Sequence, residues 1–176
     1  LDKVKVDGLL SPAFIEAAEE VSRFSASSVG AVLSALIPKS VLEKPPKLSA
    51  APTPRAGAGS AGYAGYVIQS PDEERLADYK SFIREEFARG RSVFFCLPTL
   101  RDLERTLASI EKGISSYTYI FHGGLKAKEM GRLWKAAAEE KHPVLIVSTY
   151  MFLGIPRNDV GAIILESEHS RSYRLA

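Results

Sequence analysis

Residues 92–97 read SVFFCL and are followed at 99–113 by TLRDLERTLASIEKG, and together these two stretches indicate the fold. The first is an apolar run without a charged residue, which predicts a β-strand buried on both faces. The second places three leucines and one isoleucine on a single helical face, which predicts an amphipathic helix. A buried strand that leads directly into such a helix is the repeating unit of a parallel sheet.

The same alternation of strand and helix continues on both sides of this unit. Further strands are expected at residues 65–69, 117–121, 143–148 and 161–167, and further helices at residues 71–90 and 126–141. Apolar strands that alternate with helices predict an α/β fold, a parallel sheet with helices on both faces joined by right-handed crossovers. Ligands on such sheets bind at the carboxyl ends of the strands.

A short helical segment is expected before the alternating region. Residues 11–24 begin with Ser11 as the expected N-cap and a proline at the first helical position, and residues 27–38 keep helical spacing until a proline stops them. The following stretch is dense in proline, glycine, alanine and serine, which predicts a flexible linker. The expected organisation is a helical segment at 1–42, a linker at 43–65 and an α/β domain at 66–176.

Composition is that of a soluble globular protein, with 45% hydrophobic and 25% charged residues among 176. No apolar run approaches the length of a membrane span, so we expect a cytoplasmic protein without a membrane partner. The single cysteine, Cys96, lies in the apolar run and is expected to be a buried thiol, which excludes an internal disulfide and a cysteine metal cluster. A net charge of +2 permits nucleic-acid binding without indicating it.

Four stretches resemble motifs of one helicase family, in the family's order. They are ARGRSVFFCLPTL at 88–100, FHGGLKAKEMGRLWKAA at 121–137, VLIVSTYMFLGIP at 144–156 and PRNDVGAIILESEHSRSYRLA at 156–176. They resemble the strand and motif Ia, the histidine-glycine-leucine segment, the glycine-threonine-arginine-serine segment and the DEEH motif of the replication-restart helicase PriA (primosomal protein N′) family, in superfamily 2. Residues 9–38 are similar to the end of that family's N-terminal domain, which captures DNA 3′ ends. The resemblance implies a RecA-like sheet, helicase lobe 1, preceded by a remnant of the DNA-binding domain.

The sequence departs from the family at the nucleotide site. By the resemblance, the glycine-rich loop falls on residues 69–76, with Arg75 at the lysine position and Leu76 at the position of the hydroxyl that holds Mg²⁺. A leucine cannot bind a metal, Pro71 donates no N–H, and three acids follow where phosphates would lie. The same residues fit a helix start, because Ser70 and Glu73 are spaced as a capping box.

The DEEH-like motif is altered as well. Its first two acids fall on Glu166 and Ser167, followed by Glu168 and His169. A serine cannot act as the carboxylate that activates water, and Glu166 with His169 gives too few ligands for a metal site. We therefore expect a vestigial site that binds neither ATP nor Mg²⁺, and a chain without ATPase activity or cofactor.

The DNA-contacting motifs are retained better. By the resemblance, the candidate DNA-binding residues are Pro98, Thr99, Arg101, His122, Gly123, Gly124, Lys126, Ser148 and Thr149. Hydroxyls, basic side chains and backbone N–H groups at strand ends are suited to positioning phosphates. In the alternative interpretation, Thr99 only caps the next helix and the two glycines only form a turn. Trp134 is expected in the core rather than against a base.

Two functions follow as hypotheses. The first is a catalytically inactive, PriA-like protein that binds single-stranded or forked DNA, or DNA 3′ ends, in replication restart or repair, with replication or repair proteins as further partners. The second is a protein-interaction scaffold built on a helicase lobe that has lost its ATP site. DNA binding should weaken steeply with salt, whereas docking to a protein need not.

Overall fold

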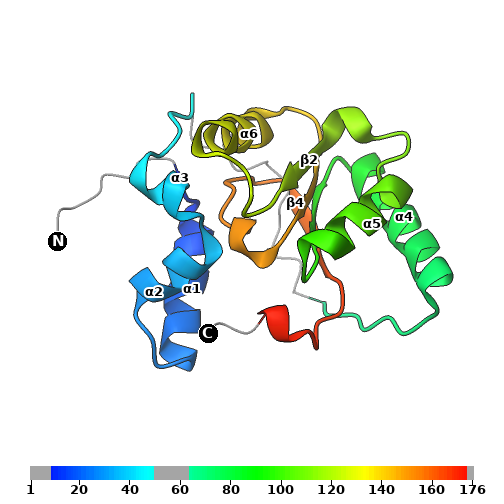
Figure 1. The fold of residues 1–176 in the computed structure, drawn as a ribbon, viewed down its shortest axis with the longest axis horizontal. Coiled ribbons are helices and arrows are strands. Elements are labelled where there is room, and N and C mark those ends of the chain that lie inside the picture. The colour runs from blue at the N-terminus through cyan, green and yellow to red at the C-terminus, as the bar shows by residue number, and fades with distance from the viewer. Residues whose placement is uncertain (1–8, 50–63, 174–176) are drawn as a thin grey trace.

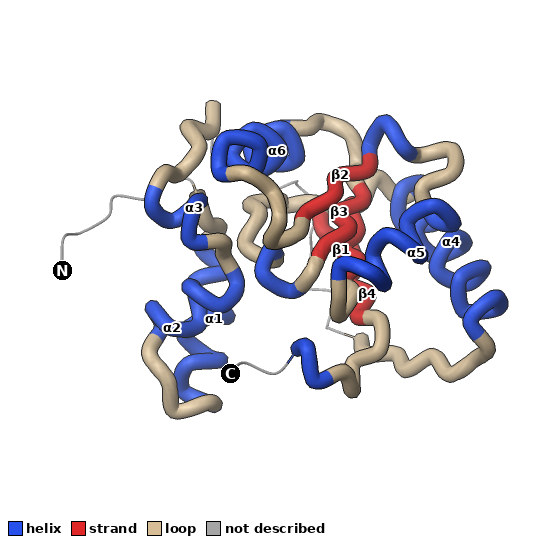
Figure 2. Tube along the Cα trace, viewed as in Figure 1, coloured by secondary structure: helices blue, strands red, loops and turns tan. Residues whose placement is uncertain are grey.

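The computed structural model describes residues 9–49 and 64–173. Within these residues the chain forms one four-stranded, all-parallel sheet with the strand order β2-β3-β1-β4, which Figure 2 shows from top to bottom. The strands are β1 (Ser92–Cys96), β2 (Thr118–Phe121), β3 (Leu145–Ser148) and β4 (Val160–Leu165). The expected parallel α/β architecture is confirmed.

Helices cover both faces of the sheet, as expected (Figure 1). On one face lie α4 (Asp72–Ala88) and α5 (Leu100–Ile110), and on the other lie α6 (Ala127–Glu139) and the N-terminal helices α1 (Pro12–Phe24), α2 (Val29–Leu36) and α3 (Lys39–Glu43). Three short 3-10 helices complete the described elements, η1 (Ser115–Tyr117), η2 (Tyr150–Phe152) and η3 (Arg171–Tyr173).

Two apolar clusters result, one on each face. The sheet residues Phe95 and Val147 pack with Ile83 of α4 on one face, while Phe94 and Ile146 point to the other. This division follows from the alternation of side chains along a strand. Cys96 is fully buried as expected, and burial raises the pKa of its thiol to about 12.

The N-terminal helices share the second of these clusters. Ile37 and Val41 are buried in one core with Trp134 of α6 and Phe152 of η2. Trp134 is 0% exposed, which confirms its expected place in the core. The backbone approach is close here, because a Cβ on Gly154 would lie 2.8 Å from Cγ1 of Ile37. The first helices are thus part of the packing of the α/β region.

Local signals set the ends of these helices. The Ser11 hydroxyl accepts a hydrogen bond from the Phe14 N–H at the start of α1, as expected of an N-cap. The proline after α2 stops that helix, and α3, which was not expected, begins directly behind it. Of the expected linker 43–65, residues 50–63 lie outside the described residues.

The expected strand at 65–69 is wrong. These residues have no assigned secondary structure, and Tyr66, Val67 and Ile68 are 83%, 94% and 49% exposed. Whether a segment forms a strand depends on packing against its neighbours. The region beside β4 provides little such packing, because Ile163 and Leu165 are themselves 59% and 46% exposed. Among the described residues, β4 is therefore an edge strand.

The start of β4 contains a register irregularity opposite Ser92 and Val93. Glu86 of α4 reaches this point with a side chain that is only 3% exposed, and its Oε1 binds Nη1 of Arg89 (2.9 Å) and Nη2 of Arg91 (2.7 Å). A Cβ on Gly161 would collide with the other carboxylate oxygen of Glu86. Glycine is therefore required at position 161 by lack of space.

Candidate nucleic-acid interface and expected nucleotide site

The carboxyl ends of three neighbouring strands lie level with one another. Phe121 of β2 pairs with Ser148 of β3, and Ser148 pairs with Cys96 of β1. The expected DNA-binding residues follow these positions directly, at 98–101, 122–126 and 148–149. Because the strands are parallel and adjacent, the structure brings these three segments to one edge of the sheet.

Thr99 caps α5, as one of the two interpretations expects. Its Oγ1 accepts a hydrogen bond from the Asp102 N–H (3.2 Å) and donates one to Oδ2 of Asp102 (2.6 Å). The residue is nevertheless exposed, as is Arg101 beside it, while Pro98 is half-buried. The cap thus leaves the outer side of this segment open to a ligand.

Residues 122–125 form a turn at the end of β2. Nδ1 of His122 accepts a hydrogen bond from the Gly124 N–H (3.2 Å), and the Leu125 N–H bonds back to the His122 carbonyl (3.2 Å). A Cβ added to Gly123 would meet no atom within 4 Å, so the space beside this exposed backbone is free. Lys126 follows as the N-cap residue of α6 and is exposed.

Ser148 differs from the other candidates because it is 0% exposed. Its hydroxyl cannot touch DNA in this conformation, whereas Thr149, next in the chain, is half-buried at the edge. The resemblance placed both residues in the same role, and their burial differs because Ser148 is the last residue of the fully buried strand β3, whereas Thr149 lies beyond the strand.

An ion pair fills the place where the resemblance puts the nucleotide. Nη2 of Arg75 lies 3.0 Å from Oε1 of Glu166, and Nε lies 3.3 Å from Oε2. The Tyr79 hydroxyl donates to Oε2 of Glu166 at 2.7 Å. Arg75 also donates to Oδ1 of Asp72 and to the Ser70 carbonyl, each at 2.8 Å. The two residues 91 positions apart thus hold the start of α4 to the end of β4.

This cluster is largely shielded from water. The side chains of Arg75 and Glu166 are 21% and 13% exposed. Hydrogen bonding to Asp72, together with Glu166, raises the pKa of the Arg75 guanidinium. Burial, and then the hydrogen bond to Glu166, raises the pKa of Tyr79. Arginine therefore keeps its charge, tyrosine keeps its proton, and both are directed at the one carboxylate.

Of the other residues of the expected nucleotide site, Ser167 contacts Glu166, whereas Leu76, Glu168 and His169 lie apart from it. Leu76 packs against the core on the α4 face. Ser167 has a left-handed backbone (φ 52°) and its hydroxyl lies 3.3 Å from Oε1 of Glu166. Glu168 and His169 point into solvent, with side chains 69% and 82% exposed. In the described part of the chain, no three His, Cys, Asp or Glu side chains gather as a metal site would require.

The expected capping box at 70–73 is wrong. Helix α4 begins at Asp72, so its N-cap residue is Pro71, which makes no side-chain cap. Ser70 lies one residue too early, and its carbonyl instead accepts from Arg75. The acids of the first turn remain, Asp72, Glu73 and Glu74, and they favour this helix end through its dipole.

Sequence reasoning gave no role to Tyr173, which the structure places at the centre of the strand ends. Its hydroxyl donates to the Glu166 carbonyl (2.9 Å), with the Cys96 carbonyl as a second acceptor 3.0 Å away. Its ring meets that of Tyr150 edge to face, with centroids 6.3 Å apart. No spacing in the sequence signals this contact, because the acceptors are backbone carbonyls.

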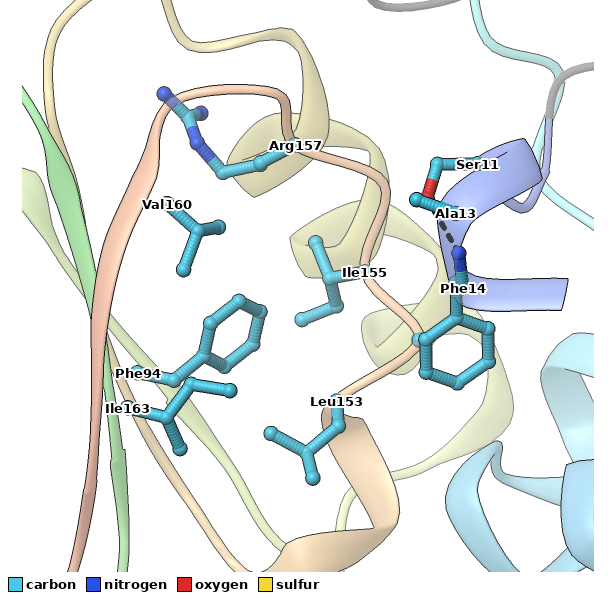
Figure 3. A pocket seen from close by; sticks show the side chains of 10 residues that line it. Ser11, Ala13, Phe14, Phe94, Leu153, Ile155, Arg157, Val160 and Ile163 are labelled. Carbon is cyan, nitrogen blue, oxygen red and sulfur yellow. Dashed lines mark hydrogen bonds between the residues drawn. The ribbon is translucent and has the colours of Figure 1, made fainter. Parts of the chain in front are cut away.

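A separate hollow of about 290 Å³ opens on the α1 face of the sheet (Figure 3). Apolar side chains that include Phe14, Phe94 and Ile163 line it. Arg157 at its border is bound to Asp159, with Nη2 and Oδ2 2.7 Å apart, and to three backbone carbonyls at the end of α6 and just after it. None of the residues expected in the nucleotide or DNA sites lines this hollow.

Comparison with models of known protein families finds no match for this chain. Among the helices of residues 9–49 and 64–173, none combines the length and the apolar character that crossing a membrane requires.

Proposed function

We propose that this chain is a catalytically inactive, PriA-like protein that binds single-stranded or forked DNA at the carboxyl edge of its sheet, in replication restart or repair. One observation carries the proposal. The segments after β1, β2 and β3, which resemble DNA-contacting motifs, lie side by side at one edge because the three strands are adjacent and parallel. A phosphate backbone that crosses this edge would meet all three in turn.

The charges at this edge suit the proposal. Arg101 and Lys126 are exposed on two of the segments, and Lys128 and Arg132 are exposed on α6, which begins directly after Lys126. All four side chains are exposed, so phosphates can reach them without first displacing other parts of the protein. Acceptor groups of α5 lie nearby, Asp102 among them, and they limit how far the nucleic acid can extend over that helix.

The absence of catalysis is supported by the cluster at Glu166. Mg²⁺ takes oxygen ligands, and the carboxylate that would hold it already accepts from Arg75 and Tyr79. Binding of a nucleotide would have to break these bonds and bring phosphates toward three acids of α4. A DNA-binding role that ignores ATP fits this arrangement.

The test is fluorescence anisotropy on single-stranded, forked and blunt DNA across a salt series, with and without Mg²⁺-ATP. We expect binding to single-stranded or forked DNA that falls steeply with salt and does not change with ATP. Arg101→Ala with Lys126→Ala should lower the salt slope by about 1 for each phosphate that the protein no longer binds. The matched control is Arg84→Ala with Lys112→Ala, which removes two exposed cations, one on α4 and one after α5, that belong to none of the assigned segments.

Failure of every DNA to bind would refute the proposal, and equal effects of the two double variants would refute the assigned surface. If no DNA binds, the hypothesis of a protein-interaction scaffold replaces that of a DNA-binding protein. A specific observation favours it as the second candidate, since Val21 and Phe24 of α1 are 45% and 94% exposed and offer apolar surface to a partner. Binding of a protein partner there would persist at high salt.

A further inference from the structure

The segment after β4 turns back across the ends of two strands. Residues 166–169 form a turn, with the Ser170 N–H bonded to the Ser167 carbonyl at 2.8 Å, and η3 follows. Figure 1 shows this segment, in red, turning back below the sheet. The Tyr173 hydroxyl then binds the carbonyls of Cys96, which ends β1, and Glu166, which follows β4. One side chain thereby fixes a segment of seven residues.

The ring of Tyr173 lies close to two of the segments assigned to DNA. It packs edge to face on Tyr150, which directly follows Thr149. Besides burial, the nearby charges that raise its pKa include that of Asp102 in the first turn of α5, the helix that Thr99 caps. The ring thus lies against the segment after β3, while its hydroxyl is bound at the end of β1.

The chain topology gives this position its importance. After β1 the chain passes to α5 on one face of the sheet, and after β3 it passes through η2 to the opposite face. Where neighbouring parallel strands send their connections to opposite faces, a crevice forms at their carboxyl ends and ligands bind there. Tyr150 follows β3 closely and Tyr173 is bound at the end of β1, so the two rings lie at this point of the sheet.

We infer that residues 167–173 are a closing segment, held by Tyr173, which must be released before DNA can lie across the ends of β1 and β3. This inference rests on the proposed function, because it concerns the regulation of the same edge. Release would also carry Glu168, an exposed acid, away from the path of the phosphates. The protein then exists in a closed form and an open form, and only the open form binds.

The change expected from a single substitution can be bounded. The affinity measured for DNA is the affinity of the open form multiplied by the fraction of open molecules. Tyr173→Phe keeps the ring and removes the hydroxyl, and the loss of a hydrogen bond of this kind shifts such an equilibrium by about three- to tenfold. DNA binding should become tighter by the same factor.

The experiment compares the wild-type chain, Tyr173→Phe and the control Tyr66→Phe, whose ring is 83% exposed. Hydrogen exchange followed by mass spectrometry reports on peptides that cover residues 166–173, and anisotropy on forked and single-stranded DNA reports on affinity. Faster exchange of these peptides together with about three- to tenfold tighter binding in Tyr173→Phe alone is the expected result.

Each other outcome is decisive. Unchanged exchange would show that Tyr173 does not hold the segment. Faster exchange with equal or weaker DNA binding would overturn the closing role while leaving DNA binding itself intact. If none of the three proteins binds any DNA, the proposed function and the gating of DNA both fail, and accelerated exchange would then establish only the tether.

Discussion

Replacing Glu166 with glutamine removes one negative charge from the end of β4 and leaves the side-chain volume almost unchanged. The carboxylate accepts from Nε and Nη2 of Arg75 and from the Tyr79 hydroxyl. A glutamine offers one acceptor oxygen in place of two, and its NH₂ group must face one of these donors. The substitution therefore tests whether this cluster fastens α4 to the sheet.

The expected loss of stability lies between two known limits. Exposed ion pairs contribute about 0–1 kcal/mol, and breaking a buried pair costs about 3–5 kcal/mol. Glu166 and Arg75 are 13% and 21% exposed, which places the pair between these cases. Arg75 retains Asp72 and the Ser70 carbonyl, so its charge is not left unpaired. We expect a loss of about 2 kcal/mol, or about 4–8 °C in Tm for a chain of this size.

Urea and thermal unfolding followed by circular dichroism measure this loss, and Glu168→Gln is the matched control. The Glu168 side chain is 69% exposed, so its substitution should stay within about 0.5 kcal/mol of the wild type. Equal stability of the two variants would refute the fastening role of Glu166. A rise in the wild-type Tm on adding Mg²⁺-ATP would also contradict this reasoning. It would mean that Mg²⁺-ATP binds and that the carboxylate of Glu166 leaves Arg75 to accommodate it.

Two further predictions concern packing and pH. Gly161→Ala should lower the free energy of unfolding by about 1–3 kcal/mol, because the added methyl group collides with a buried carboxylate. Gly123→Ala is the control and should leave stability almost unchanged, because the space around Gly123 is open. Similar urea midpoints for the two variants would contradict this prediction. Burial raises the pKa of Tyr79 and Tyr173, so the unfolded chain, whose tyrosines ionise near pH 10, loses these protons first. The stability that these two protonated tyrosines contribute is complete below about pH 10 and is lost as the pH rises further. The double variant with phenylalanine at both positions should therefore show a shallower decline of urea midpoints between about pH 9 and 11.5 than the wild type. Parallel curves would refute the raised pKa of the two tyrosines.

The parts of the fold that could be predicted from sequence are those in which local pattern and burial agree. The run SVFFCL is buried on both faces throughout β1, and the helix after it begins at the expected threonine cap. The run GYVIQ has a similar apolar character but forms no strand, since a strand also needs a covered neighbour, and the sequence does not show that the sheet ends at β4. Helices and strands were therefore predictable where long-range packing and the local sequence pattern favour the same structure.

The sequence predicted which strand ends form the candidate site, but it did not predict the side-chain contacts beside them. Parallel strands bring their carboxyl ends to one edge by geometry alone, which places Thr99, Gly123 and Thr149 near one another. The bond between Arg75 and Glu166 joins residues far apart in sequence, and no local pattern encodes it. The start of α4 was predicted one residue too early, an error within the usual uncertainty of a helix end. This shift was enough to remove the capping box expected at Ser70.

The burial of the N-terminal helices in the core of the sheet has a consequence for synthesis on the ribosome. Ile37 and Val41 emerge more than a hundred residues before Phe152 and Ile155, their partners in the core. At ordinary rates of translation this interval lasts on the order of ten seconds, during which the apolar sides of α2 and α3 lack part of the core that covers them in the folded protein. We therefore expect the nascent chain to expose apolar helical surface during this period, and such surface favours aggregation.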